Sequence, residues 1–425
     1  MGDPLDRTVN LSNWMDPPFN RTAFTRVREV VPTAPIRAGG SPRTLARQPV
    51  DLDGVTFDRA DGSRVDWQTH LATTWCDAVC VVHRGTIVDE RYFNGCDEHT
   101  LHLLMSVSKS VCGAALGVAI GRGRLSASDL VCDIAPEFRG TSAEGAAVRH
   151  LIDMTAGTGF VEDYDDYSTA GPAASPDGSL AESPLIEYER QAGYRPLGSR
   201  IPIGALGHFR TYATDRPHGS WFSYRSPLTN VVARLLEVLE GLRYPDIVAR
   251  DLWQPLGMEH DADIMLDPLG HPVVEGGMSC SLRDLARLGL AYARAGDGVI
   301  PPEWVRDTFD GDDGTALAFR ADPAGSDVPP DWSMYRNAFW VLRRHERISG
   351  LGIFGQFCWV DLATDTVIAR FSTFPSALPL DTSDEVHRAS LPCPHRSART
   401  SNAHPLGHGR HPLPARRSVL TVVTD

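Results

Sequence analysis

Strand-like runs lie near both ends of the chain. Residues 78–82 and 87–93 favour β-structure and flank His83-Arg84-Gly85-Thr86, a pattern that predicts a β-hairpin. Residues 355–360 and 366–372, separated by a polar segment at 361–365, predict a second hairpin. The two hairpins are about 280 residues apart along the chain. They belong to one sheet only if the chain between them folds as an insertion.

The segments between the hairpins have the spacing of helices. Residues 103–120 are apolar almost all round, which predicts a buried helix that stops at Gly121-Arg122-Gly123. Segments 146–157, 226–241 and 281–296 have helical periodicity, and each ends at a glycine. Because strand-like runs flank a helical middle, the sequence predicts an α+β fold, with an antiparallel sheet flanked by helices and an inserted helical domain.

The predicted organisation has four parts. Residues 1–50 form an extended, Pro-rich lead-in with one short helix at 24–30. Residues 51–124 and 266–385 form the α/β domain, and residues 125–265 form the helical domain. Residues 386–425 are expected to be a disordered tail, because from Val386 to Thr424 the chain has no Asp or Glu and is rich in Pro, His and Arg. The tail residues His404, His408 and His411 could bind a metal, but a solvated tail is the simpler interpretation.

Composition narrows the class of protein. The 425 residues are 42% hydrophobic and 22% charged, as in ordinary globular proteins, and the net charge of -13 argues against binding to nucleic acid or to a membrane surface. The N-terminus lacks the apolar stretch of a secretory signal, and no run has the length of a membrane span. The eight cysteines are scattered, which indicates reduced thiols in a cytoplasmic protein rather than a zinc site or a disulfide framework.

Ser106-Val107-Ser108-Lys109 is the first candidate for chemistry. Ser106 and Lys109 are three residues apart at the start of the predicted buried helix and therefore share one of its faces. A serine hydroxyl needs a nearby base to become a nucleophile, and a desolvated lysine can be that base. The alternative is a helix-capping serine followed by a surface lysine, which fits poorly with a helix that is apolar on all sides.

Lys109 is also the only lysine of the sequence, since every other strongly basic residue is arginine. Arginine is effectively never deprotonated, whereas a buried lysine can become neutral. Retention of lysine at this one position supports a role as a base.

Two further elements complete the predicted site. Tyr224-Arg225-Ser226 places a phenol and a hydroxyl two residues apart before a helix, where Tyr224 could carry a proton and Ser226 could face the same cleft. Residues 350–355 read G-x-G-x-x-G, but a strand follows them rather than a helix, which excludes the dinucleotide fingerprint. A Gly-rich strand edge admits a substrate to the backbone, and the N–H of Ile353 is expected to pair with that of Ser106 as an oxyanion hole.

This ordered set of motifs resembles the β-lactamase and penicillin-binding protein superfamily, in which a β-lactamase/DD-peptidase-like fold is expected. The class C β-lactamases and related carboxylesterases are the nearest broad group. Segments SVSKS, GTGFVEDY, FSYRSPLTN and GIFGQ are similar to the 6-aminohexanoate-dimer (nylon-oligomer) hydrolases. The resemblance covers about residues 9–380. It implies that Ser106 is the nucleophile, Lys109 the base and Tyr224 the second proton carrier. It also implies that Tyr164 closes over the substrate and that Trp340 lies near an aromatic wall of the pocket.

One departure from the family pattern bears on the substrate. Where β-lactamases carry Lys-Thr-Gly, whose cation holds the carboxylate of the drug, this chain has Gly350-Leu351-Gly352. The expected function is therefore a serine hydrolase that forms an acyl-enzyme on Ser106 and cleaves small linear amides or esters, without metal or cofactor. Arg225 or Arg343 could supply the missing cation. A β-lactamase or D-alanyl-D-alanine peptidase, and a non-catalytic binding or sensor protein, stay open as alternatives, as does a homodimer.

Overall fold

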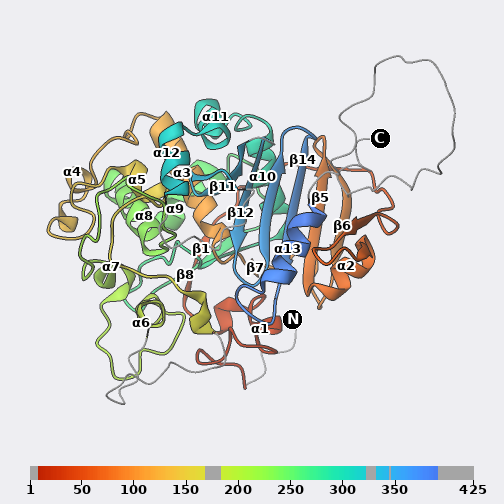
Figure 1. Cartoon of the computed structure of the whole chain (residues 1–425), viewed down its shortest axis with the longest axis horizontal. Helices are drawn as coiled ribbons and strands as arrows, with labels where there is room; N and C mark the ends of the chain where they lie inside the picture. Colours follow the sequence, from red (N-terminus) through yellow and green to blue (C-terminus); the bar gives the residue numbers. More distant parts are fainter. Residues whose placement is uncertain (1–7, 168–182, 322–331, 344–345, 391–425) are drawn as a thin grey trace.

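Two segments far apart in the sequence form one eight-stranded sheet (Figure 1). The computed structural model describes residues 8–167, 183–321, 332–343 and 346–390. Every neighbouring pair of strands in this sheet is antiparallel except β2 with β6. Across the sheet the strands are β10 (Met334–Arg336), β11 (Phe339–Leu342), β12 (Arg347–Gly352), β13 (Gln356–Asp361), β14 (Thr366–Ser372), β5 (Cys76–His83), β6 (Thr86–Tyr92) and β2 (Ala46–Arg47).

Both predicted hairpins are confirmed, as β5–β6 and as β13–β14. They lie side by side because β14 pairs with β5, in a register that places Ile368 opposite Val81. All eight residues of β5 are buried, as expected for a central strand covered on both faces. The strand-like runs at the two ends of the chain therefore form a single sheet, and the structure has the predicted α+β class.

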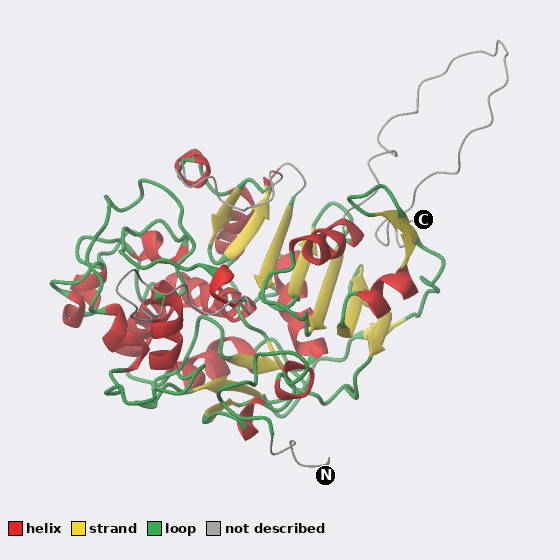
Figure 2. Cartoon of the chain, turned by 60° about the horizontal axis from the view of Figure 1, so that its bottom comes forward, coloured by secondary structure: helices red, strands yellow, loops and turns green. Residues whose placement is uncertain are grey.

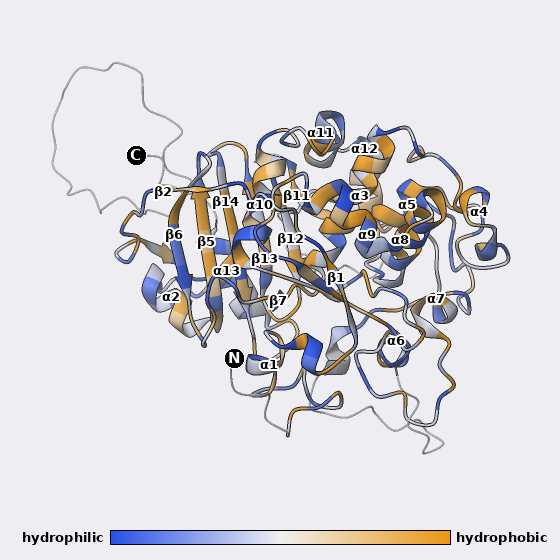
Figure 3. Cartoon of the chain, turned by 180° about the vertical axis from the view of Figure 1, so that it is seen from behind, coloured by the Kyte–Doolittle hydropathy of each residue, from blue (hydrophilic) through white to orange (hydrophobic). Residues whose placement is uncertain are grey.

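Helices cover both faces of this sheet (Figure 2). On one face lie α3 (Val107–Gly121) and α10 (Leu282–Ala293), and on the other α2 (Trp67–Thr73) and α13 (Leu380–Ala389). Gly289 of α10 allows the close approach, because a Cβ there would lie 2.5 Å from Val367 of β14. On the opposite face, the Trp359 ring of β13 contacts the His387 ring of α13 edge-on at 5.0 Å. Apolar residues fill the interior, and in Figure 3 α3 and β5 are mainly hydrophobic.

A smaller four-stranded antiparallel sheet supports the start of α3. Its order is β1-β8-β9-β7, with β1 (Thr33–Ile36), β8 (Ala262–Met265), β9 (Met278–Cys280) and β7 (His102–Leu103). A two-stranded sheet pairs β3 (Thr56–Asp58) with β4 (Arg64–Asp66). Because β7 leads into α3 through residues 104–106, the small sheet fixes where that helix begins.

Short helices make up most of the rest. They are α1 (Asn20–Ala23), η1 (Val27–Glu29), α4 (Val131–Ile134), η2 (Pro136–Phe138), α5 (Val148–Ile152), η3 (Tyr164–Tyr167), α6 (Pro184–Ala192), α7 (Gly204–Phe209), α8 (Pro227–Glu240), α9 (Tyr244–Val248), η4 (Ala249–Trp253), α11 (Pro302–Asp310) and α12 (Asp313–Arg320). None of the helices in the described part of the chain is long and apolar enough to cross a bilayer.

The structure changes several details of the predicted elements. The lead-in carries strands β1 and β2 besides short helices, and β8 lies within the segment expected to be helical. The helix predicted over 146–157 is reduced to α5, because Met154 takes a left-handed conformation (φ 57°) that ends it. The tail was expected from residue 386, but α13 continues to Ala389, and residues 391–425 lie outside the described part of the chain.

Candidate active site

Ser106 and Lys109 meet at the amino end of α3, as predicted. The Nζ of Lys109 donates a hydrogen bond to the Oγ of Ser106 at 2.8 Å and a second to the carbonyl oxygen of Glu275 at 2.7 Å. Ser106 is the residue directly before the helix rather than part of its first turn, and Met105 before it has a left-handed backbone (φ 46°). Such strained conformations persist where the surrounding structure enforces them, and they are frequent at active sites. This sharp turn presents the Ser106 side chain to the lysine.

The environment of Lys109 suits a base. The residue is 1% exposed, and burial lowers the pKa of its ammonium group from 10.5 to about 8. The carboxylates of Glu162 and Glu275 oppose this decrease. An appreciable fraction of Lys109 is therefore neutral near neutral pH, which an exposed lysine would not be.

Tyr224 lies over the same pair of residues. Its ring centroid is 4.9 Å from Nζ of Lys109, and its ring stacks on Trp340 of β11 at 5.7 Å with an interplanar angle of 16°. Burial raises the pKa of its phenol above the usual range, while the hydroxyls of Ser106 and Tyr335 oppose that rise. Tyr224 thus stays protonated and can donate and relay a proton. Trp340 is in place to fix the Tyr224 ring, and it is not among the residues that line the cavity described next.

A small cavity of about 40 Å³ opens beside Ser106. Four of the residues predicted for the site line it: Ser106, Tyr164, Ser226 and Ile353. The remaining lining residues are Met15, Met105, Glu162, Tyr167, Leu185, Tyr188, Glu189, Tyr194, Glu275 and Gly276. Ile353 lies in the tight turn between β12 and β13, so this part of the Gly-rich segment reaches the cavity at Ser106.

Glu162 organises one wall of the cavity. Its carboxylate accepts hydrogen bonds from Ser226, through Oγ at 2.7 Å and through the backbone N–H at 2.5 Å, and also from the hydroxyl of Tyr164. Ser226 and Tyr164 are therefore held in the site through a residue that sequence reasoning did not single out. Glu162 is visible in the segment GFVEDY, but nothing local shows that it connects Ser226 to Tyr164.

The cavity lining is acidic. It contains three carboxyl groups, of Glu162, Glu189 and Glu275, and no arginine or lysine among the described residues that form it. The two arginines considered as substitute cations do not reach it. Arg225 is buried and donates to the carbonyl oxygen of Thr158 and to Asp215, and Arg343 pairs with Asp313 at 3.3 Å.

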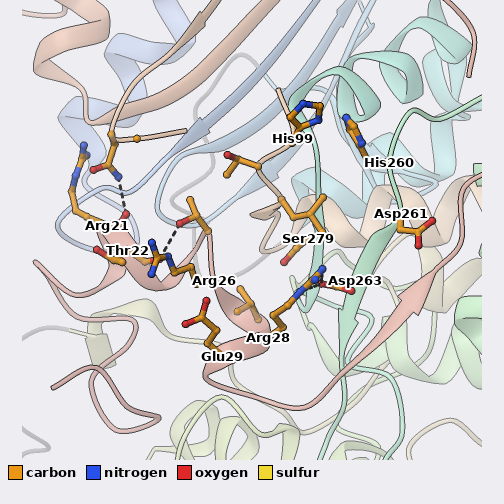
Figure 4. A pocket seen from close by; sticks show the side chains of 16 residues that line it. Arg21, Thr22, Arg26, Arg28, Glu29, His99, His260, Asp261, Asp263 and Ser279 are labelled. Carbon is orange, nitrogen blue, oxygen red and sulfur yellow. Dashed lines mark hydrogen bonds and ion pairs between the residues drawn. The ribbon is translucent and has the colours of Figure 1, made fainter. Parts of the chain in front are cut away.

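A larger cavity, of about 620 Å³, lies elsewhere and shares no residue with the first (Figure 4). Three arginines from α1, η1 and the turn between them line it, opposite His99 and His260, whose rings contact at 5.0 Å. The charge of Arg28, one of these arginines, is neutralised by Asp263, to which its Nε donates at 2.9 Å. This larger cavity brings no nucleophile and base together. Within the described ranges, no group of three or more His, Cys, Asp or Glu side chains is placed to hold a metal ion.

A serine hydrogen-bonded to a buried lysine, at the start of a helix packed on an antiparallel sheet, is an arrangement typical of serine hydrolases of the Ser-Lys type. The model of the β-lactamase family matches residues 74–391, about three quarters of the chain, and the protein belongs to that family. It is a serine hydrolase, and the predicted superfamily is confirmed.

Individual relatives agree with this assignment. The 6-aminohexanoate-dimer hydrolase of Paenarthrobacter ureafaciens is 32% identical over 369 residues, which cover 86% of this chain and 88% of the relative. A solved structure from Bacillus anthracis, assigned as a 6-aminohexanoate-dimer hydrolase, superposes with a TM-score of 0.77 at 22% identity and covers 91% of this chain and 95% of its own. The hydrolase EstCE1, titled as having promiscuous acyltransferase activity, covers 75% of this chain and 96% of its own at 18% identity, with a TM-score of 0.56. The last two likenesses show the fold alone.

Proposed function

We propose that the protein hydrolyses small linear amides or esters through an acyl-enzyme on Ser106. The observation that carries the proposal is the 2.8 Å contact between Lys109 Nζ and Ser106 Oγ at a buried site beside a cavity. Neutral Lys109 removes the proton of the Ser106 hydroxyl, and Oγ attacks the carbonyl carbon of the substrate. The backbone N–H groups of Ser106 and Ile353 are proposed to hold the oxyanion that forms.

Collapse of this tetrahedral intermediate breaks the bond to the leaving amine or alcohol. The proton taken by Lys109 passes to that leaving group, with the hydroxyl of Tyr224 as the relay. A water molecule then loses a proton to the same groups and attacks the acyl-enzyme. The acid product leaves, and Ser106 regains its proton. Apart from the substrate and this water molecule, no group outside the chain is needed to balance these steps.

The charge of the cavity supports the choice of substrate. A β-lactam carries a carboxylate beside its scissile ring, and the described lining offers it three glutamates and no cation. A charge-assisted hydrogen bond to such a carboxylate contributes roughly 1.5–3 kcal/mol, or one to two orders of magnitude in binding. A neutral ester or amide, or one with an ammonium group, loses no binding free energy when the cavity lacks a cation. The similarity to a hydrolase named for the 6-aminohexanoate dimer supports a linear amide.

The test compares three substrates with one enzyme preparation: a short-chain p-nitrophenyl ester, the 6-aminohexanoate dimer and a chromogenic cephalosporin. The value of kcat/KM for the ester should exceed that for the cephalosporin by about a hundredfold, the upper part of the range expected for a missing cation. The Ser106→Ala variant measures the background for each substrate. Comparable efficiency on the ester and the cephalosporin would favour a β-lactamase, and hydrolysis of none would favour a binding or sensor protein.

We also propose a cytoplasmic location, a small-molecule substrate as the main partner, and no role for nucleic acid or a membrane. Free cysteines support the location: the seven within the described residues form no disulfide, and six of them are buried. A homodimer stays open, and light scattering of the purified protein decides it. A monomer at micromolar concentration would remove the dimer from the proposal.

A further inference from the structure

Glu275 is a buried carboxyl group beside Lys109 that the proposed reaction leaves without a role. It lies between β8 and β9, is 3% exposed and lines the cavity at Ser106. Its backbone carbonyl oxygen accepts the second hydrogen bond of the Lys109 ammonium group, at 2.7 Å. The backbone of Glu275 thus holds the base in place, while its side chain extends into the same buried region.

Within the described ranges, the hydrogen bond that holds the carboxyl group is made at one of its two oxygens. Oε1 of Glu275 accepts a hydrogen bond from the Tyr188 hydroxyl at 2.9 Å. The amide of Asn230 on α8 donates to that hydroxyl at 2.7 Å and accepts from the N–H of Val274 at 2.8 Å, which fixes the chain of contacts. The second oxygen, Oε2, is buried and has no hydrogen-bond partner among the described residues.

A glutamate is an unfavourable choice for a purely structural role here. Glutamine has the same shape and can accept the Tyr188 hydrogen bond through its amide oxygen. A buried carboxylate without full pairing costs several kcal/mol by general experience. The property that glutamate adds over glutamine is a negative charge, and the cation whose charge acts on it is Lys109.

We propose that Glu275 is a positioning residue whose charge sets the protonation of Lys109, and with it the pH range in which Ser106 is activated. The inference rests on the proposed function, since it assumes that Lys109 is the base. No hydrogen bond joins the carboxyl group of Glu275 to Ser106 or to Lys109, and this group acts on the lysine through its charge.

The titration behaviour of the two groups supports this. Burial raises the pKa of Glu275 from 4.5 to about 7, and burial lowers that of Lys109 to about 8, so both groups titrate in one range. Each opposes the shift of the other, since Lys109 lowers the pKa of Glu275 and the carboxylates of Glu275 and Glu162 raise that of Lys109. The other titratable groups around the pair are Glu189 and the phenols of Tyr164, Tyr167, Tyr188, Tyr194 and Tyr224. The phenols of Tyr164, Tyr188, Tyr194 and Tyr224 have raised pKa values and stay neutral in this range.

The charge of Glu275 determines in which direction the pH profile of the enzyme is displaced. Lys109 must lose its proton to act as a base, so kcat/KM rises with pH through the pKa of Lys109. The negative charge of Glu275 favours the ammonium form and raises that pKa. Removal of the charge should therefore move the acid limb of the profile to lower pH, on the order of one pH unit, the size of shift that a nearby charge produces in a buried site.

The experiment measures kcat/KM from pH 5 to pH 10 with a p-nitrophenyl ester for four proteins. The Glu275→Gln variant keeps the shape and loses the charge, and its acid limb should move to lower pH by about one unit. The Tyr188→Phe variant keeps the glutamate but removes the hydrogen bond that stabilises its charge, and should move the limb less in the same direction. Glu90→Gln removes another glutamate with a buried side chain, on β6, which three strands separate from β12, and should leave the limb in place.

Each outcome of this experiment either supports or overturns the proposed role of Glu275. A profile of Glu275→Gln that coincides with that of the wild type, even at a lower maximum rate, would reduce Glu275 to a structural role and overturn the inference. A shift to higher pH would overturn it as well. If Glu275→Gln does not fold, the Tyr188→Phe profile decides by the same criterion. The proposed function fails separately, when Ser106→Ala retains ester hydrolysis, so the two failures are distinguishable.

Discussion

Replacing Lys109 by arginine should remove most of the activity while keeping the positive charge. The magnitude follows from the environment of the residue. At pH 7, a pKa of about 8 leaves about one lysine in eleven neutral, against about one in three thousand at the ordinary value of 10.5. An arginine with a pKa of at least about 12.5 is neutral in about one molecule in three hundred thousand.

The ratio of these fractions is at least on the order of 10⁴ between lysine and arginine, so the neutral base is effectively absent in the variant. General-base catalysis typically contributes about 10²–10⁴ in rate, and we therefore expect Lys109→Arg to lose on the order of a thousandfold in kcat/KM. The wild-type profile should rise through about pH 8, where Lys109 titrates, and the variant should show no rise in that range.

The assay is steady-state hydrolysis of a p-nitrophenyl ester, with circular dichroism and thermal unfolding as tests of the fold. Lys109→Met is the matched variant, because it fills the site without a charge or a base. If the positive charge of Lys109 were what matters, the arginine variant would retain much more activity than the methionine variant. Near wild-type rates for Lys109→Arg would refute the assignment of the base.

Three further predictions follow from the site. Tyr224→Phe should lower kcat/KM by about 10²–10⁴ with the far-ultraviolet spectrum unchanged, and a loss below about threefold would exclude Tyr224 as the proton relay. Gly352→Ala should destabilise the fold by about 1–3 kcal/mol in denaturant titration, because a Cβ there would lie 2.6 Å from the carbonyl oxygen of Leu104; an unchanged midpoint would contradict this contact. Because the pKa of Glu275 is raised from 4.5 to about 7, the stability it contributes is present below about pH 4.5 and is lost as the pH rises through 7. Between pH 5 and pH 7.5, the melting temperature of Glu275→Gln should therefore fall less than that of the wild type. Equal decreases in the two proteins would contradict the raised pKa.

The contact between Ser106 and Lys109 was predictable because their relation is local. Residues three apart on a helix share a face whatever the rest of the chain does, so Ser106 and Lys109 could be paired from the sequence. Lys109, as the only lysine, carried a second signal that was independent of the helix. The hairpins were predictable for the same reason, since alternation and turn residues are local properties.

The acidic wall of the cavity was not predictable, because it depends on contacts between distant segments. Glu275 lies 166 residues from Lys109 in sequence, and only the β8–β9 connection brings its carbonyl oxygen to Nζ. Glu162 joins Ser226 across 64 residues, which no periodicity indicates. The pairing of β8 with β1 was missed for a similar reason: a four-residue strand has too little pattern to stand out within a helical segment.

The position of Trp340 could not be predicted without the fold. The resemblance to the family placed it at an aromatic wall, and the structure places its ring against Tyr224 rather than among the residues that line the cavity. An aromatic side chain of this kind restricts the phenol to one orientation, which preorganises the proposed relay. Sequence pattern gives the residue type, but only the strand register gives its neighbour.

The most direct test of the central claim is covalent labelling of the intact protein with a fluorophosphonate, followed by mass spectrometry and peptide mapping. The account predicts one adduct per chain, located at Ser106 within the segment SVSKS, and none in Ser106→Ala. The rate of labelling should rise with pH through about 8, as Lys109 loses its proton. An adduct at another serine, or stoichiometric labelling that persists in Ser106→Ala, would contradict the account.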